Sequence, residues 1–145
     1  MRQLDWPPLW TLAHMAAATL LGWIWSPLGP EAAIIGWVLI AASVGLAIWA
    51  ALVMRQAKTT VIPGRPPAAL VETGPFKKTR NPIYLADLGI LAGWCWVVEQ
   101  PLGIALLFPL QWVLQNRFVV HEEAALRAAF GDAYEDYCKR VPRWV

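Results

Sequence analysis

Charged residues are scarce in this chain. They make up 15% of its 145 residues, while 58% are hydrophobic and the mean hydropathy is +0.45. This composition is too apolar for an ordinary soluble domain. Cysteine and histidine are also rare, with two of each. His14 and His121 stand alone and neither Cys95 nor Cys138 has metal-ligand spacing, so we expect no metal site. Cys95 belongs to an apolar run and Cys138 to the polar tail, so we expect no disulfide between them.

Four apolar runs hold most of the hydrophobic residues. The clearest, residues 32–54, has no charge and is long enough to cross about 30 Å of hydrocarbon as a helix. The run 6–25 follows a basic residue, as a signal peptide would, but no small-x-small cleavage site comes after it. We therefore predict one all-α, integral-membrane domain over residues 1–145, with the first two helices as antiparallel neighbours. Its transmembrane helices are expected at residues 6–25, 32–54, 82–98 and 101–117.

The basic residues are segregated along the chain. All twelve lie at the N-terminus, in the connector 55–80, or from Arg117 onward, whereas the two opposite loops carry only Glu31 and Glu99. Four spans place every basic residue on one side of the membrane, which the positive-inside rule assigns to the cytoplasm. We expect both termini, the connector and the C-terminal region 118–145 on that face.

The connector and the C-terminal region carry the helix signals outside the apolar runs. The connector 55–80 is rich in proline and polar residues, so it cannot be a helix inside lipid. Asn81 is expected to cap a helix that begins at Pro82. After the amphipathic stretch that follows Arg117, Gly131 is expected to end the helix. Asp132 and Glu135 resemble the start of a last short helix with a capping box.

Two sequence blocks resemble a superfamily of integral-membrane methyltransferases, which includes the isoprenylcysteine carboxyl methyltransferases and the phospholipid N-methyltransferases. The resemblance covers roughly residues 59–145. The first block is Gly74-Pro75-Phe76 followed by Arg80-Asn81-Pro82-Ile83-Tyr84, and the second is His121-Glu122-Glu123, Phe130-Gly131-Asp132, Tyr134, Tyr137 and Arg140-Val141-Pro142. Asn81 stands where the isoprenylcysteine enzymes usually have histidine, and Ala86 where a glycine is frequent.

The resemblance implies a cofactor, S-adenosyl-L-methionine, held where the connector and the C-terminal region fold over each other. The expected catalytic residues are Arg80, Tyr84 and Glu123. The expected cofactor-binding residues are Gly74, Pro75, Asn81, Pro82, Tyr84, Leu85, His121, Glu122, Tyr134 and Tyr137.

The roles of the charged side chains stay partly open. Glu122 and Glu123 are neighbours on a helix and point about 100° apart, so they cannot both face one ligand group. We expect one to face the cofactor and the other to pair with a basic residue such as Arg127. Arg80 is suited to orient an anionic acceptor through a bidentate contact. Asp87, an acid inside a predicted span, either pairs with a basic residue such as Arg80 or faces an amine acceptor.

The sequence therefore predicts methyl transfer to a lipophilic acceptor that enters from the bilayer at the cytoplasmic face. Carboxyl O-methylation of the isoprenylcysteine type, or of a related small hydrophobic acceptor, is the first hypothesis, and N-methylation of a phospholipid is the alternative. A non-enzymatic membrane scaffold or ligand-binding protein is the alternative of another class. Membrane lipids are expected partners, and nucleic acid is not.

Overall fold

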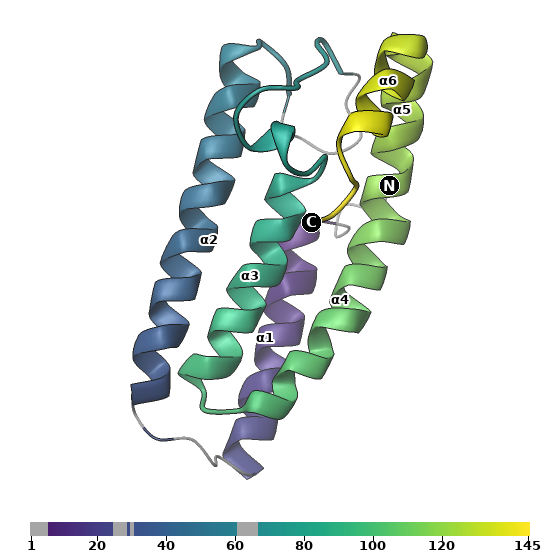
Figure 1. The fold of residues 1–145 in the computed structure, drawn as a ribbon. Helices are drawn as coiled ribbons and strands as arrows, with labels where there is room; N and C mark the ends of the chain where they lie inside the picture. Colours follow the sequence, from purple (N-terminus) through teal and green to yellow (C-terminus); the bar gives the residue numbers. More distant parts are fainter. Residues whose placement is uncertain (1–5, 25–28, 30, 61–66) are drawn as a thin grey trace.

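The computed structural model describes residues 6–24, 29, 31–60 and 67–145, and this part of the chain is helical without a strand. The prediction of an all-α chain is thus confirmed. Three separate helices come first: α1 (Pro7–Ile24), α2 (Glu31–Gln56) and α3 (Pro82–Val97) (Figure 1). A short 3-10 turn, η1 (Gly74–Lys77), precedes α3. The remaining helices are η2 (Pro101–Leu106), α4 (Leu107–Leu114), η3 (Gln115–Val119), α5 (Val120–Phe130) and α6 (Asp132–Arg140).

The segments predicted as apolar helices are helical, with one change of extent. The fourth was expected to end near residue 117, but Pro101–Phe130 forms one run of 30 residues. This run and α2 are the two helices in the described residues that are long and apolar enough to cross a membrane, and α3 is a shorter apolar helix. The run stays continuous because η3, a π-helical turn, joins α4 to α5 without a break.

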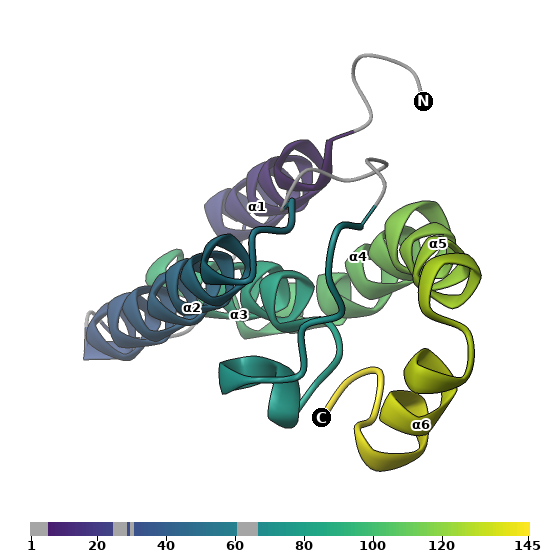
Figure 2. The same ribbon diagram turned by 90° about the horizontal axis from the view of Figure 1, so that it is seen from above.

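Helix α3 is the centre of the packing. Its most extensive contact is with α2, and α1 packs on α3 and α4. Seen end-on in Figure 2, α1 lies on one side of the row formed by α2, α3 and α4, and α6 lies on the other. The first two helices were predicted as antiparallel neighbours; they do run in opposite directions (Figure 1), but α1 and α2 each pack mainly on α3 and not on each other.

Two glycines explain why α3 packs so closely on α2. A Cβ atom added at Gly36 of α2 would lie 2.5 Å from the Gly93 carbonyl oxygen, and one added at Gly93 of α3 would lie 2.7 Å from the Gly36 carbonyl oxygen. Such backbone contact is possible only without side chains. Gly45, on the same helix as Gly36, has nothing within 4 Å of its Cβ position. Gly36 therefore faces α3, whereas Gly45 faces away from it.

Apolar side chains of three elements fill the space between α1, α3 and α4. Leu91 and Cys95 of α3, Leu110 and Leu114 of α4 and Phe118 of η3 are almost completely buried. Both cysteines are free thiols, as expected. At the opposite end of the bundle from the α3–η2 turn, the connector, α5 and α6 lie together (Figure 1). The two sequence blocks therefore meet at one end of the bundle.

The expected helix caps differ from those observed. Asn81 does occupy the position before Pro82, but its side chain makes no capping bond; its Nδ2 instead donates to the carbonyl oxygen of Arg143 at 3.0 Å. Gly131 ends α5 with a positive φ of 51°, as its lack of a Cβ allows. Asp132 is the first residue of α6 and provides no side-chain cap, so the predicted capping box is absent.

Candidate functional site

A cavity of about 720 Å³ lies at the end of the bundle where the two blocks meet. Its walls come from the first residues of α1, the end of α2, the connector, the start of α3, and the faces of η3, α5 and α6 that turn toward them. Such a volume is typical of small-molecule sites. Elements distant in the sequence thus build one site.

Most of the residues expected at the site line this cavity. They are Arg80, Asn81, Pro82, Tyr84, His121, Glu122, Glu123, Tyr134 and Tyr137.

Three expected cofactor-binding residues, Gly74, Pro75 and Leu85, do not line the cavity. Gly74 has a positive φ of 59°, and a Cβ there would meet Val53 of α2 at 2.9 Å. Pro75 is buried, and its carbonyl oxygen accepts N–H groups of the following turn. Leu85 is rotated about 100° around α3 from Tyr84, which does face the cavity. Gly74 and Pro75 shape the turn before α3, so their place in the sequence block is structural here.

Tyr84 and Glu122 form a hydrogen-bonded pair across the cavity. The Tyr84 hydroxyl of α3 donates to Glu122 Oε1 of α5 at 2.7 Å. The Tyr84 ring also stacks on Phe118 of η3, with ring centroids 6.2 Å apart and planes at 25°. A short bond to a carboxylate and a ring contact together hold the Tyr84 side chain in one orientation. Glu122 is therefore the glutamate whose carboxylate is directed to the α3 side of the cavity.

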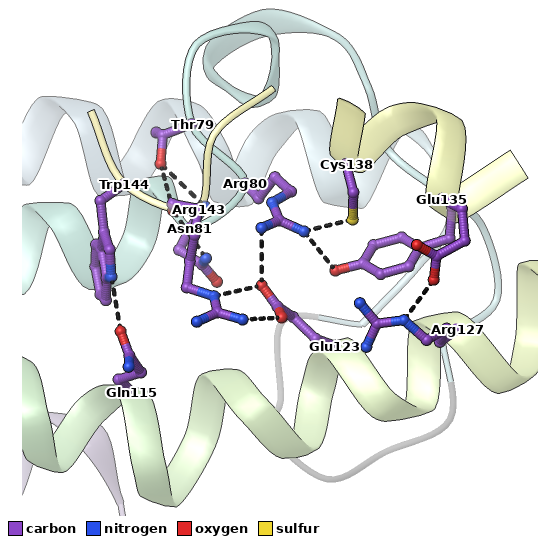
Figure 3. A network of polar contacts seen from close by, with 11 residues as sticks. Thr79, Arg80, Asn81, Gln115, Glu123, Arg127, Glu135, Cys138, Arg143 and Trp144 are labelled. Carbon is purple, nitrogen blue, oxygen red and sulfur yellow. Dashed lines mark hydrogen bonds and ion pairs between the residues drawn. The ribbon is translucent and has the colours of Figure 1, made fainter. Parts of the chain in front are cut away.

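Glu123 is the centre of a separate ionic network, drawn in Figure 3. Its side chain is 5% exposed and accepts two hydrogen bonds from Arg143, Nε to Oε1 at 2.9 Å and Nη2 to Oε2 at 2.6 Å. These bonds raise the pKa of Arg143 above its usual value. Arg80 Nη2 lies 3.4 Å from Glu123 Oε1. The expected pairing of Glu123 with Arg127 was wrong: Arg127, in the next turn, binds Glu135 of α6 at 2.5 Å.

Arg80 is held by several groups at once. Besides the ion pair with Glu123, its Nη1 contacts the Cys138 sulfur and lies 3.5 Å from the Tyr134 hydroxyl oxygen (Figure 3). Its Nε is buried, and within the described part of the chain this N–H has no partner. Asp87 is not among the partners of Arg80, although the two were considered as a pair from the sequence. Arg80 thus shares the Glu123 carboxylate with Arg143, and one of its donors has no partner among the described residues.

The two tyrosines of α6 are buried anchors. Tyr134 is 1% exposed and Tyr137 is 3% exposed. Burial is the main cause that raises the pKa of each phenol, so both hydroxyls stay protonated at neutral pH. The Tyr137 hydroxyl donates to the carbonyl oxygen of Phe76 at 2.7 Å. Through this bond α6 is attached to the turn that precedes α3.

The last residues of the chain cover the start of α3. The Arg80 backbone N–H donates to the Pro142 carbonyl oxygen at 3.0 Å. The Arg143 carbonyl oxygen accepts bonds of 3.0 Å from both Thr79 Oγ1 and Asn81 Nδ2. The two sequence blocks are therefore joined by direct hydrogen bonds, and Asn81 contributes to this contact.

Sequence reasoning missed three contributors to the site. Arg143 directly follows the quoted second block, and its position beside Pro142 was the available signal. Phe118 was assigned to an amphipathic stretch, without a role in the cavity. Thr11 of α1 interacts with the Asp87 carboxylate, a contact between distant helices that no local pattern could indicate.

The chain is similar in sequence to known proteins. An alignment of 78 positions with a Delta(14)-sterol reductase of Mus musculus has 35% identity and covers 50% of this chain and 18% of that protein. Residues 32–133, most of the chain, match the phospholipid methyltransferase family, and this match includes the first block, the Tyr84–Glu122 pair and Glu123. The chain therefore belongs to the phospholipid methyltransferase family, within the superfamily of integral-membrane methyltransferases that its sequence blocks resemble.

Proposed function

We propose that this protein is a membrane methyltransferase that uses S-adenosyl-L-methionine to methylate a lipophilic acceptor. The observation that carries the proposal is that both sequence blocks line one cavity, in which Tyr84 of the first block binds Glu122 of the second at 2.7 Å. Family membership supports methyl transfer as the reaction class. The cavity supplies the place for it.

The residues that line the cavity fit such a cofactor. A sulfonium cation favours carboxylates and aromatic faces, and the described lining residues offer Glu122, Tyr84 and Phe118. The buried Nε of Arg80, which lacks a partner in the described residues, can donate to a carboxylate or hydroxyl oxygen of the ligand. Glu122, His121 and Arg80 are accordingly the residues that we assign to the cofactor.

The cofactor supplies an activated methyl group, and the protein supplies alignment and a site shielded from water. Tyr84 holds the Glu122 carboxylate in place, and the Phe118 ring closes the apolar side. The Glu123 network fixes the start of α3 to the chain end and so keeps this side of the cavity rigid. In this proposal the catalytic role expected for Glu123 becomes a positioning role.

The charges in the cavity favour an amine acceptor over a carboxylate. Arg80, the residue suited to bind a carboxylate, is already paired with Glu123. The described lining residues include three acids, Asp87, Glu122 and Glu123. Two arginines balance them, Arg80 in the lining and Arg143, which binds Glu123, so one negative charge is in excess among these groups. A negative excess attracts a cationic ammonium group and repels a carboxylate. The acceptor that we propose is therefore a lipophilic amine, as in N-methylation of a phospholipid, with carboxyl O-methylation as the alternative.

A lipophilic acceptor agrees with the surroundings of the site. Apolar residues of the connector and α5, such as Leu70, Leu126 and Ala129, share the lining with the charged groups. The similarity to a protein named as a sterol reductase adds a second case of a lipophilic substrate. We propose that the acceptor enters from the bilayer with its head group toward the polar end of the cavity.

We further propose that α1, α2, α3 and the Pro101–Phe130 run cross the membrane four times, with the site at the cytoplasmic face. The segregation of basic residues supports this arrangement. Single cysteines at exposed Gly29 and Lys77 test it in a Cys95→Ala/Cys138→Ser background. A membrane-impermeant maleimide should label Gly29→Cys from outside intact cells and Lys77→Cys only after permeabilisation. The reverse pattern would contradict the proposed orientation.

Titration calorimetry of the purified protein with S-adenosylhomocysteine is the direct test of the cofactor site. We expect saturable binding, and transfer of labelled methyl from the cofactor to a lipid amine, with little transfer to a hydrophobic acid. Absence of binding at millimolar ligand would contradict the enzyme proposal and favour a non-enzymatic scaffold. Binding with transfer only to the acid would keep the enzyme and change the acceptor class.

A further inference from the structure

Asp87 is the cavity-lining acid to which no role has yet been assigned. It follows Tyr84 by three residues, so both side chains lie on the same face of α3. Leu91 and Cys95, one and two helical turns beyond Asp87 on the same face of α3, are buried and apolar. Asp87 therefore marks the inner limit of the polar part of the cavity, one helical turn farther from the connector than Tyr84.

The contacts of Asp87 leave its charge uncompensated within the described residues. Its contact there is Thr11 of α1, a buried hydroxyl that also lies 3.5 Å from the Pro7 carbonyl oxygen. A threonine hydroxyl is uncharged and has one proton to donate, so Thr11 does not neutralise the carboxylate. An ionisable side chain in an apolar helix is costly and is a candidate for a functional role.

Glu122 and Asp87 lie at different depths in the cavity. Glu122 of α5 lies at the level of Tyr84, to which it is hydrogen-bonded, and next to His121 in the sequence. Asp87 stands on α3, on the apolar side. The proposed reaction brings two cations into this cavity, the sulfonium of the cofactor and the ammonium group of the acceptor. Glu122 on α5 and Asp87 on α3 therefore provide one carboxylate for each of the two cations.

We propose that Asp87 is the catalytic residue that binds the ammonium group of the acceptor and removes a proton from it. This inference rests on the proposed methyltransferase function and names the acceptor side of that site. The Asp87 carboxylate takes one proton from R–NH₃⁺, which leaves R–NH₂ with a free electron pair and a neutral Asp87 carboxyl group. Only the neutral amine can act as a nucleophile, so this proton transfer must precede methylation. The proton then leaves to solvent, which returns Asp87 to its charged form.

Ligand binding tests the proposal without turnover. Hexylammonium is the probe, neutral hexanol is the matched uncharged ligand, and both are titrated into the purified protein in detergent. Asp87→Asn should weaken hexylammonium binding by about tenfold or more, since a hydrogen bond between charged groups is lost, and should leave hexanol binding within about twofold. Asp132→Asn removes an exposed carboxylate at the start of α6 and is the control; it should change neither affinity.

Carbodiimide labelling of the unmodified chain gives a second measurement that requires no variant to fold. Hexyltrimethylammonium, a cation that cannot couple to an activated carboxyl group, should protect Asp87 from modification, as read by mass spectrometry, and hexanol should not. Equal affinity of Asp87→Asn and the parent protein for hexylammonium, or no protection of Asp87, would overturn the proposal. So would loss of S-adenosylhomocysteine binding with unchanged amine binding, because Asp87 would then belong to the cofactor. If the parent chain binds hexylammonium through Asp87 but not S-adenosylhomocysteine, the amine site stands and the methyltransferase proposal fails.

Discussion

Arg143 and Glu123 are joined by two parallel hydrogen bonds of 2.9 and 2.6 Å, although they are 20 residues apart and belong to different segments. Glu123 is on α5, whereas Arg143 follows α6 in the segment that covers the start of α3. The same Arg143 accepts, through its carbonyl oxygen, bonds from Thr79 and Asn81. One residue near the chain end thus ties α5 to the sequence block before α3.

Loss of the Arg143 side chain should destabilise this end of the protein. In Arg143→Ala, the buried Glu123 carboxylate keeps only the 3.4 Å contact with Arg80, so we expect a loss of about 2–3 kcal/mol in unfolding free energy. Arg143→Lys should recover only part of it, because an ammonium group cannot make the bidentate contact. The measurement is denaturant unfolding in detergent micelles.

Arg140→Ala is the matched control for that experiment. Arg140 also binds a glutamate, Glu72 at 2.6 Å, but its side chain is 63% exposed. An exposed pair contributes under about 1 kcal/mol, so Arg140→Ala should cost clearly less than Arg143→Ala. Equal losses in the two variants would show that burial of Glu123 does not set the strength of its pair.

Glu122→Gln and Glu123→Gln should have different consequences. Glu122 lines the cavity beside Tyr84, so its substitution should weaken S-adenosylhomocysteine binding by about 1.5–3 kcal/mol and change stability little. Glu123 pairs with Arg143 and Arg80, so Glu123→Gln should lower the unfolding midpoint first. Calorimetry for affinity and thermal unfolding for stability separate the two effects. The opposite assignment, with affinity lost only in Glu123→Gln, would contradict the division of roles.

The sequence was informative where the signal is local. The Asn81-Pro82 pair located the start of α3, Gly131 located the end of α5, and the uncharged run located α2. Adjacent residues on a helix point about 100° apart, and this alone indicated that Glu122 and Glu123 face different groups. These inferences depend on backbone geometry, which a short stretch of sequence determines.

The remaining features depend on contacts between distant segments. Glu123 pairs with Arg143 and not with Arg127. The chain reverses at Gly131, whose φ is 51°, and this reversal lets the segment after α6 return to α5. The same reversal brings Glu135 to Arg127. The π-helical turn η3 shifts the register of α5 relative to α4, and no residue pattern between Gln115 and Val119 indicates it.

The contact between α2 and α3 should be sensitive to a single methyl group at Gly36. The added Cβ would lie 2.5 Å from the Gly93 carbonyl oxygen and 2.7 Å from the Val97 backbone nitrogen, and backbone atoms cannot easily move away. Gly36→Ala should therefore lower the unfolding free energy by about 1–3 kcal/mol, the usual cost of overpacking. Gly45→Ala, on the same helix with nothing within 4 Å, should cause no loss. A loss of similar size at Gly45 would show that the effect does not come from helix contact.

The hydrogen bond between Tyr84 and Glu122 should couple the two residues in cofactor binding. Tyr84→Phe removes the hydroxyl that donates at 2.7 Å and keeps the ring that stacks on Phe118, so stability should change little. The Glu122 carboxylate then loses its only described donor and its fixed orientation. We expect S-adenosylhomocysteine affinity to fall by roughly tenfold, the effect of about 1.4 kcal/mol.

A double-mutant cycle isolates this coupling. If Tyr84 acts through Glu122, Tyr84→Phe should have little further effect in a Glu122→Gln background, and the interaction energy should be about 1 kcal/mol or more. Residues that act independently give effects that add within about 0.3–0.5 kcal/mol. Additive losses of affinity would therefore mean that Tyr84 contacts the ligand itself, and that the bond to Glu122 does not orient the carboxylate for the cofactor.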